Sequence, residues 1–285
     1  PWSIDLKQSI EAAGNKAFDW VIIDHYGIDF RWEQGMRPFT KNVMVIDDLA
    51  NRKHDCDLLL DQTLGREEVE YSGLTNESTR ILVGSRFALL RPEFSELRDF
   101  SLKRRAEFKM ENILVSLGGI DSGNSTQRVL ETIEQMEVPE GVLISVVLGE
   151  KSPHIHSIKN FSTTTKLRLK IEVGSKEMAR LMSGADCAIG AAGATSWERC
   201  CLGVPSIILV LAENQENIAN QLGNVGAVLV SNDLIELKIQ LEALLRSTNL
   251  LRDMSAKSSL VTDGLGCLYA VDVLVEVSRE NFNTM

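Results

Sequence analysis

The sequence predicts an α/β protein made of two domains, each a parallel β-sheet covered by helices. Three observations predict this class. Short apolar, β-branched runs alternate with helical stretches along most of the chain. The 285 residues suffice for two domains, and 44% hydrophobic with 25% charged residues is typical of a globular protein. Glycine turns separate several strands from the helices that follow them, as in sheets that bind ligands beyond their carboxyl ends.

The first predicted domain covers residues 1–95. A helix over residues 4–17 leads directly into an apolar strand at 20–24, which we expect to be buried on both faces. Such a strand needs parallel neighbours that the preceding residues do not supply, so the domain is predicted to be truncated at its N-terminus. The other expected strands are residues 43–47, 58–60 and 81–84. A charged helical segment that begins near Pro92 marks the boundary.

The second predicted domain covers residues 96–285 and is a complete doubly wound unit. Its expected strands lie in the segments NILVS, VLISVVL, LRLKIEV, CAI and SIILV, with helices between them, and the pair NQENIANQLGNVGAVLV and LIELKIQLEALL follows. A last helix, near residues 266–277, is placed in this domain as well.

Composition excludes several functions. The net charge is −10 and there is no basic stripe, which argues against a nucleic-acid partner. No apolar run is long enough to span a membrane, and the first residues do not resemble a signal peptide, so we expect a cytoplasmic protein. The five scattered cysteines are typical of reduced thiols, and the four histidines lack metal-ligand spacing. No metal and no cofactor are predicted.

The segment GAAGATSWE, residues 190–198, is the strongest candidate for a binding loop. Gly190 and Gly193 are expected to take positive φ and to let backbone approach a ligand. Thr195 and Ser196 can cap the helix that follows, so that its first N–H groups face an anion. Glu198, expected in the first turn, is suited to hold a ribose diol. On its own, the loop fits an ordinary strand-to-helix turn equally well.

Three further loops carry polar groups. Gly118 and Gly119 precede a helix expected to be capped by Ser122 or Asn124, but the GxGxxG spacing of dinucleotide-binding proteins is missing. Residues 213–217, ENQEN, crowd amides and carboxylates that suit a sugar, although a helix N-terminus rich in capping residues explains them too. The segment IIDHYG places an acid, an imidazole and a phenol at a strand end. The carboxylates of DCD, residues 55–57, are interpreted as a coincidence rather than a metal site.

Several of these motifs together resemble one family. IIDHYG, VIDDLANRKHDCDLLLDQ, LVGSRFALLRPEF, VSLGGID and GAAGATSWERCCLGVPSI are similar to the UDP-sugar hydrolases of pseudaminic acid biosynthesis. The similarity covers nearly the whole chain from about Asp19. These enzymes release UDP from a diacetamido trideoxy sugar and share the two-domain GT-B architecture with the transferase that adds N-acetylglucosamine to lipid-linked muramyl peptide.

The resemblance implies roles for individual residues. Diphosphate would lie at Gly193, Ala194, Thr195 and Ser196, with Gly118 and Gly119 nearby, and the ribose at Glu198. Met178 would lie near uracil. Asn214 and Gln215 would contact the donor sugar, and Tyr26 would line the reaction centre, so that Tyr26 and Asn214 are the expected catalytic residues. The family's base is a histidine in a GxGHxxR loop, which this sequence does not contain. The expectation is therefore a fragment, or a variant without turnover.

Two other functions fit the same motifs. The first is a GT-B glycosyltransferase that uses a UDP-amino sugar, which the loop at residues 190–198 does not distinguish from a hydrolase. The second is a non-catalytic domain that binds a sugar nucleotide, which the missing histidine favours. In all three cases the expected partner is a UDP-activated sugar, without nucleic acid or membrane.

Overall fold

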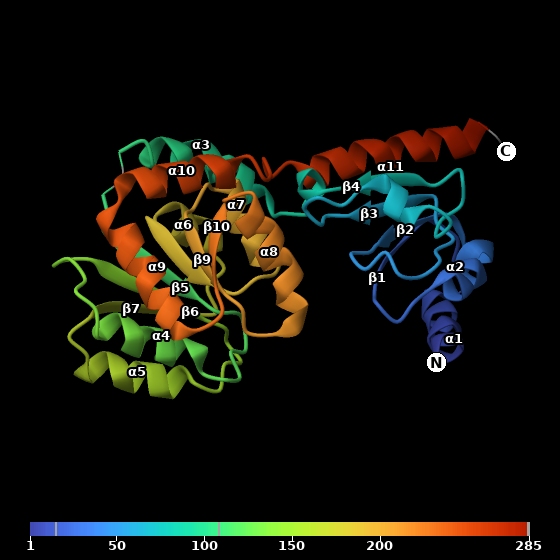
Figure 1. Cartoon of the computed structure of the whole chain (residues 1–285). Helices are drawn as coiled ribbons and strands as arrows, with labels where there is room; N and C mark the ends of the chain where they lie inside the picture. Colours follow the sequence, from blue (N-terminus) through green and yellow to red (C-terminus); the bar gives the residue numbers. More distant parts are fainter. Residues whose placement is uncertain (15, 108, 284–285) are drawn as a thin grey trace. The chain divides into compact units, whose positions relative to one another are not determined.

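The protein folds into two compact units, each built on a parallel sheet (Figure 1). The computed structural model describes residues 1–14, 16–107 and 109–283. The first unit is Pro1–Leu89 together with Leu265–Met285, and the second unit is Leu90–Gly264. Both units have the alternation of strands and helices that the sequence predicts, so the predicted fold of two Rossmann-like domains is confirmed.

The sheet of the first unit has four parallel strands in the order β1-β2-β3-β4. The strands are β1 (Phe18–Asp24), β2 (Thr40–Ile46), β3 (Leu58–Asp61) and β4 (Arg80–Val83). The helices are α1 (Trp2–Ala13), α2 (Phe30–Met36) and α11 (Gly266–Asn283), with 3-10 turns η1 (Arg37–Phe39), η2 (Glu68–Tyr71) and η3 (Ser85–Phe87).

The last helix, α11, packs against the sheet of the first unit, not the second. Its Ala270, Val273 and Leu274 lie against Leu58 and Leu60 of β3, while α1 and α2 cover the other face of the sheet. The boundary at residue 95, with everything after it in the second domain, is corrected accordingly. The physical reason is burial, because this face of the sheet is apolar and α11 supplies the side chains that cover it.

Strand β1 differs from expectation. It pairs with β2 alone and lies at the edge of the sheet. We expected it to be buried on both faces, but only Ile23 is buried, and Ile22 is 56% exposed. An apolar run that would suit a central parallel strand is used here as an edge strand.

The second unit has six parallel strands in the order β10-β9-β8-β5-β6-β7. The strands are β5 (Asn112–Ser116), β6 (Leu143–Leu148), β7 (Arg168–Val173), β8 (Cys187–Gly190), β9 (Ser206–Leu209) and β10 (Val228–Ser231). The helices are α3 (Pro92–Arg104), α4 (Ser125–Glu134), α5 (Ile155–Thr164), α6 (Met178–Ser183), α7 (Ala194–Cys201), α8 (Glu216–Asn224), α9 (Leu234–Arg246) and α10 (Thr248–Ser259), with a 3-10 turn η4 (Glu213–Gln215).

In the second unit the chain runs from β5 through β6 to β7 and then continues with β8 on the other side of β5. The strand order therefore reverses between β5 and β8. Right-handed crossovers therefore place α4 and α5 on one face of the sheet and α6, α7 and α8 on the other. Helices α4 and α9 pack together and contribute to the main core with β5, β6, β8 and β9, and α9 contacts β9 and β10. Ligands of such sheets lie beyond the carboxyl ends of the strands at the point of reversal, which here is the edge carrying the loops after β5 and β8. None of the helices described is long and apolar enough to cross a membrane.

Candidate functional site

The clearest candidate site is the loop between β8 and α7, at the carboxyl edge of the second sheet. Gly193 has φ 149° and ψ −163°, a conformation that is essentially restricted to glycine. Gly193 is also the N-cap of α7, and its N–H donates to the Ser196 hydroxyl at 3.3 Å. Thr195 and Ser196, expected as caps, lie inside the first turn. The correction follows from the backbone, because only Gly193 has the non-helical geometry of an N-cap.

The start of α7 leaves hydrogen-bond donors open. The N–H groups of Ala194 and Thr195 have no partner within the part of the chain that the structure describes. Ala194 is exposed and Thr195 is half-buried. Since the first N–H groups of a helix point out of its end, where the helix dipole is positive, this end of α7 is suited to an anion such as phosphate.

Beneath the loop lies Arg199, which the sequence analysis did not single out. The side chain is buried, and its Nη2 donates to the Ala191 carbonyl at 2.9 Å and to the Ser196 hydroxyl at 3.1 Å. Its Nη1 lies 3.3 Å from the Thr195 hydroxyl. A Cβ at Gly190 would overlap the guanidinium. Gly190 does not take positive φ, contrary to expectation, and is needed to make room for Arg199. From sequence alone an arginine within a helix is expected to be exposed to solvent. No local pattern therefore predicts that Arg199 is buried.

Glu198 presents a carboxylate without a partner. It lies in the second turn of α7, not the first as expected, because the helix begins at Ala194. The side chain is half-buried and makes no hydrogen bond within the described residues. Burial raises the pKa of the Glu198 carboxyl, and the positive charges of Arg91 and Arg199 oppose the rise. A partly desolvated carboxylate that lacks donors is suited to accept a pair of hydroxyls.

The loop after β5 approaches the same edge. Gly118 has φ 101°, and a Cβ at Gly149, after β6, would overlap Gly119, so the two loops touch. Asn124 is the N-cap residue of α4, as one of the two expected alternatives had it, but it is left-handed and its side chain makes no capping hydrogen bond. The capping hydrogen bonds are made by Asp121. Its two carboxylate oxygens accept the N–H groups of Ser125 at 2.8 Å and Thr126 at 2.9 Å.

The remaining expected contacts of the second unit lie on neighbouring loops. Met178 begins α6, after β7, and is half-buried. Gln215 ends η4, after β9, and its side-chain oxygen accepts the Leu211 N–H at 3.0 Å, which holds the turn. The side chain of Asn214 lies outside the described residues. The strand order brings the loops after β5 and β8 together, whereas Met178 and Gln215 follow β7 and β9 on opposite sides of them.

In the first unit, the expected catalytic Tyr26 meets an aspartate at the carboxyl end of the sheet. The Tyr26 hydroxyl donates to Asp48 Oδ2 at 3.0 Å. Asp48 Oδ1 is buried and has no partner among the described residues. Burial raises the pKa of the Asp48 carboxyl; the Tyr26 hydrogen bond opposes the rise, and the nearby Asp47 adds to it. Asp48 belongs to the polar stretch that follows β2, and nothing local in the sequence shows that it would face Tyr26.

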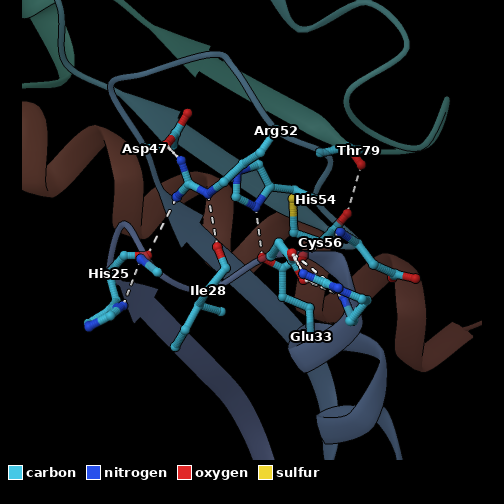
Figure 2. A network of polar contacts seen from close by, with 12 residues as sticks. His25, Ile28, Glu33, Asp47, Arg52, His54, Cys56 and Thr79 are labelled. Atoms are coloured by element: carbon cyan, nitrogen blue, oxygen red, sulfur yellow. Dashed lines mark hydrogen bonds and ion pairs between the residues drawn. The ribbon is translucent and has the colours of Figure 1, made fainter. Parts of the chain in front are cut away.

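A buried charge network holds this end of the sheet, and Figure 2 shows part of it. Arg52 Nη1 pairs with Asp47 at 2.6 Å, and its Nε donates to the Ile28 carbonyl at 2.9 Å, which ties the loop after β1 to the end of β2. The Tyr71 hydroxyl lies 2.9 Å from both Asp47 and Asp61. These groups give Tyr26 and Asp48 a rigid base.

Several other polar groups of the first unit pair with one another, although His54 Nε2 is buried without a partner among the described residues. His54 and Glu33 are both buried and lie 2.7 Å apart (Figure 2). Asp55 and Asp57 both pair with Arg37, at 2.7 and 2.5 Å. The two carboxylates therefore link η1, at the end of α2, to the segment that leads into β3. Within the described residues no group of three potential ligands is placed to hold a metal.

The chain is similar to proteins of sugar-nucleotide and polysaccharide metabolism. No family model matches it. It is 33% identical over 153 residues to the spore coat polysaccharide biosynthesis protein SpsG of Bacillus subtilis, a match that covers 53% of this chain and 44% of that protein. It therefore spans less than half of SpsG. It is 23% identical over 224 residues to the UDP-2,4-diacetamido-2,4,6-trideoxy-beta-L-altropyranose hydrolase of Campylobacter jejuni, covering 79% of this chain and 78% of the hydrolase.

The solved structure of Acinetobacter baumannii MurG resembles the chain in fold. The TM-score is 0.66 at 18% identity, and the likeness covers 96% of this chain and 77% of MurG. The fold is of the GT-B type. The four-stranded and six-stranded parallel sheets are its two Rossmann-like domains.

Proposed function

We propose that this protein binds a UDP-activated amino sugar and releases UDP from it by hydrolysis. The substrate we infer is a UDP-linked 2,4-diacetamido-2,4,6-trideoxy hexose, the class named for the Campylobacter relative. One observation supports the proposal most. A single helix, α7, carries both the open N–H groups of Ala194 and Thr195 and the unpaired carboxylate of Glu198. Those are the groups that a nucleoside diphosphate requires for its phosphates and its ribose.

The other residues take complementary roles in this proposal. Gly118 and Gly119 leave space for a phosphate beside α7, because neither has an atom near the position of a Cβ. Met178 packs on the uracil ring, and Gln215 and Asn214 contact the donor sugar. The diphosphate is a good leaving group once its charge is stabilised, so the start of α7 also assists departure.

The reaction consumes water. The water oxygen forms a bond to the anomeric carbon, the bond from that carbon to the UDP oxygen breaks, and its electron pair leaves with UDP. A base must take the proton of the water. His25 is poorly suited, because its Nδ1 accepts the Gly27 N–H at 2.9 Å, which leaves the proton of the neutral ring on Nε2. Asp48 accepts the Tyr26 hydroxyl on Oδ2, and its Oδ1 has no partner among the described residues but is buried, so this carboxylate would have to become exposed to act as the acceptor.

A second function is a glycosyltransferase of polysaccharide synthesis. The match to SpsG favours it, since that protein is named for spore coat polysaccharide biosynthesis. In a transferase the same α7 site would hold UDP, but an acceptor hydroxyl would replace the water.

The test incubates the purified protein with the UDP-diacetamido sugar in H₂¹⁸O, without any acceptor, and analyses both products by mass spectrometry. Hydrolysis at the anomeric carbon places ¹⁸O in the free sugar and none in UDP. Release only after an acceptor is added supports the transferase. Absence of UDP binding by calorimetry overturns both.

A further inference from the structure

The buried guanidinium of Arg199 is the least expected group near the candidate site. We propose that it is an electrostatic component of the diphosphate subsite, which acts from beneath the loop of residues 190–193 without touching the ligand. The inference rests on the proposed function, because it assumes that this loop holds the phosphates of a UDP-sugar. Arg199 directly follows the segment GAAGATSWE and is not among the predicted site residues.

Arg199 carries a charge that no direct ion pair neutralises, although the Glu198 carboxylate acts on it through space. The Arg199 side chain is only 2% exposed, and no ion pair joins it to a carboxylate of the described residues. Its hydrogen-bond partners are the Ala191 carbonyl and the hydroxyls of Thr195 and Ser196, all neutral. Its Nε is buried without any partner. Burial lowers the pKa of Arg199, yet a guanidinium keeps its proton at neutral pH. An unpaired buried charge is costly, so it calls for a compensating anion.

The position of the charge favours an anion at the start of α7. The guanidinium donates hydrogen bonds to the hydroxyls of Thr195 and Ser196 in the first turn. These residues lie next to the open N–H groups of Ala194 and Thr195. A buried charge is screened less than a surface charge, so its field adds to that of the helix end. This local positive field matters in a protein whose net charge is −10, because the overall field opposes an anionic ligand.

The loop geometry depends on the same group. The Ala191 carbonyl points toward Arg199 and is removed as an acceptor from the ligand side of the loop. Gly190 has to be a glycine because a side chain there would displace the guanidinium. The conformation of the loop and the position of the guanidinium therefore depend on each other.

A second buried arginine provides a matched control. Arg105 is 3% exposed, and its Nη2 donates to the carbonyls of Met182 and Ala185 at 3.1 and 2.6 Å. It lies beside Asp186, just before β8, and so at the amino edge of the sheet where no ligand is proposed. Removing either arginine empties a buried site of similar size, but only one of them lies next to the loop.

The experiment compares the wild type with Arg199→Met, Arg199→Gln and Arg105→Met. Thermal unfolding first establishes that each variant folds. Affinities for uridine, UMP and UDP are then measured by NMR titration or calorimetry at constant ionic strength. We expect Arg199→Met and Arg199→Gln to weaken UDP by at least about tenfold, UMP by less, and uridine not at all, because the lost charge acts on the phosphates. Arg105→Met should lose stability while keeping all three affinities.

The outcomes separate the two proposals. If the wild type does not bind UDP, the proposed function fails. If the wild type binds UDP and a folded Arg199→Met variant binds it equally well, only the role of Arg199 is overturned. An equal loss for uridine and UDP also overturns it, since that pattern reports a damaged loop. Wild-type affinity in Arg199→Gln, which keeps N–H donors but no charge, shows that hydrogen bonding suffices and overturns it as well.

Discussion

Replacement of Glu198 by glutamine tests whether the carboxylate of this residue accepts hydrogen bonds from the ribose hydroxyls of a bound nucleotide. The Glu198 carboxylate is half-buried and has no hydrogen-bond partner among the described residues. A ribose diol would supply two donors to it. Glutamine keeps the size of the side chain but replaces one acceptor oxygen by a donor and removes the charge. The helix should persist, because glutamine is nearly as good a helix former as glutamate.

The magnitude follows from the type of bond that is lost. A hydrogen bond to a charged group contributes about 1.5–3 kcal/mol, so Glu198→Gln should weaken UDP roughly tenfold to a hundredfold. The wild type should also show a pH dependence. Because burial raises the pKa of Glu198, the carboxylate takes up its proton at a higher pH than an ordinary glutamate does. The affinity for UDP should therefore begin to fall earlier as the pH is lowered.

Calorimetry with UDP and 2′-deoxy-UDP provides the assay. In the wild type, removal of the 2′-hydroxyl should cost affinity, whereas in Glu198→Gln the two nucleotides should bind nearly alike. This double comparison isolates the contact between the carboxylate and the hydroxyl. Equal discrimination between the two nucleotides in both proteins would show that Glu198 does not hold the ribose.

Four other predictions follow from the structure. UDP should bind in the presence of EDTA, since the open N–H groups at the start of α7 are suited to hold its phosphates without a cation; a strict magnesium requirement would contradict this. Tyr71→Phe should destabilise the first unit by about 1–3 kcal/mol, because the one hydroxyl proton shared between the buried Asp47 and Asp61 carboxylates is lost, and hydrogen exchange of β3 measures the loss. Tyr26→Phe should lower the rate of UDP release without abolishing UDP binding, and an unchanged rate would exclude the hydroxyl from the reaction. Asp121→Ala should cost about 1 kcal/mol of unfolding free energy in chemical denaturation, since α4 loses its cap.

Acid stability of the first unit should depend on Asp47. Burial by itself would raise the pKa of this carboxyl, but the Ala50 N–H, the Arg52 guanidinium and the Tyr71 hydroxyl together lower it. A lowered pKa in the folded state means that the stabilisation is complete above the unfolded-state pKa and is lost as the pH falls through the folded-state value. Arg52→Met should therefore shift acid unfolding to higher pH, as circular dichroism can follow. An unshifted transition would show that this ion pair does not contribute.

The helices and strands could be predicted from the sequence because their formation depends on residues that are close together along the chain. Strands β2, β3 and β8 are short apolar runs bounded by polar or glycine residues, and the helices between them follow the usual periodicity. The need for glycine at Gly193 was also visible, since the loop turns sharply into α7. The same local logic failed at β1, because an apolar run does not state whether a strand is central or at an edge.

The sequence by itself determined the alternation of strands and helices, the glycine loops and the candidate residues on α7. Only the tertiary structure decided that α11 returns to the first sheet, that Asp48 meets Tyr26, and that Arg199 is buried beneath its loop. The physical reason is separation along the chain. Periodicity and capping involve residues within a few positions of each other, whereas the partner of a buried or charged group is chosen by packing. Ala270 lies far along the chain from Leu58, and no local pattern records that they touch.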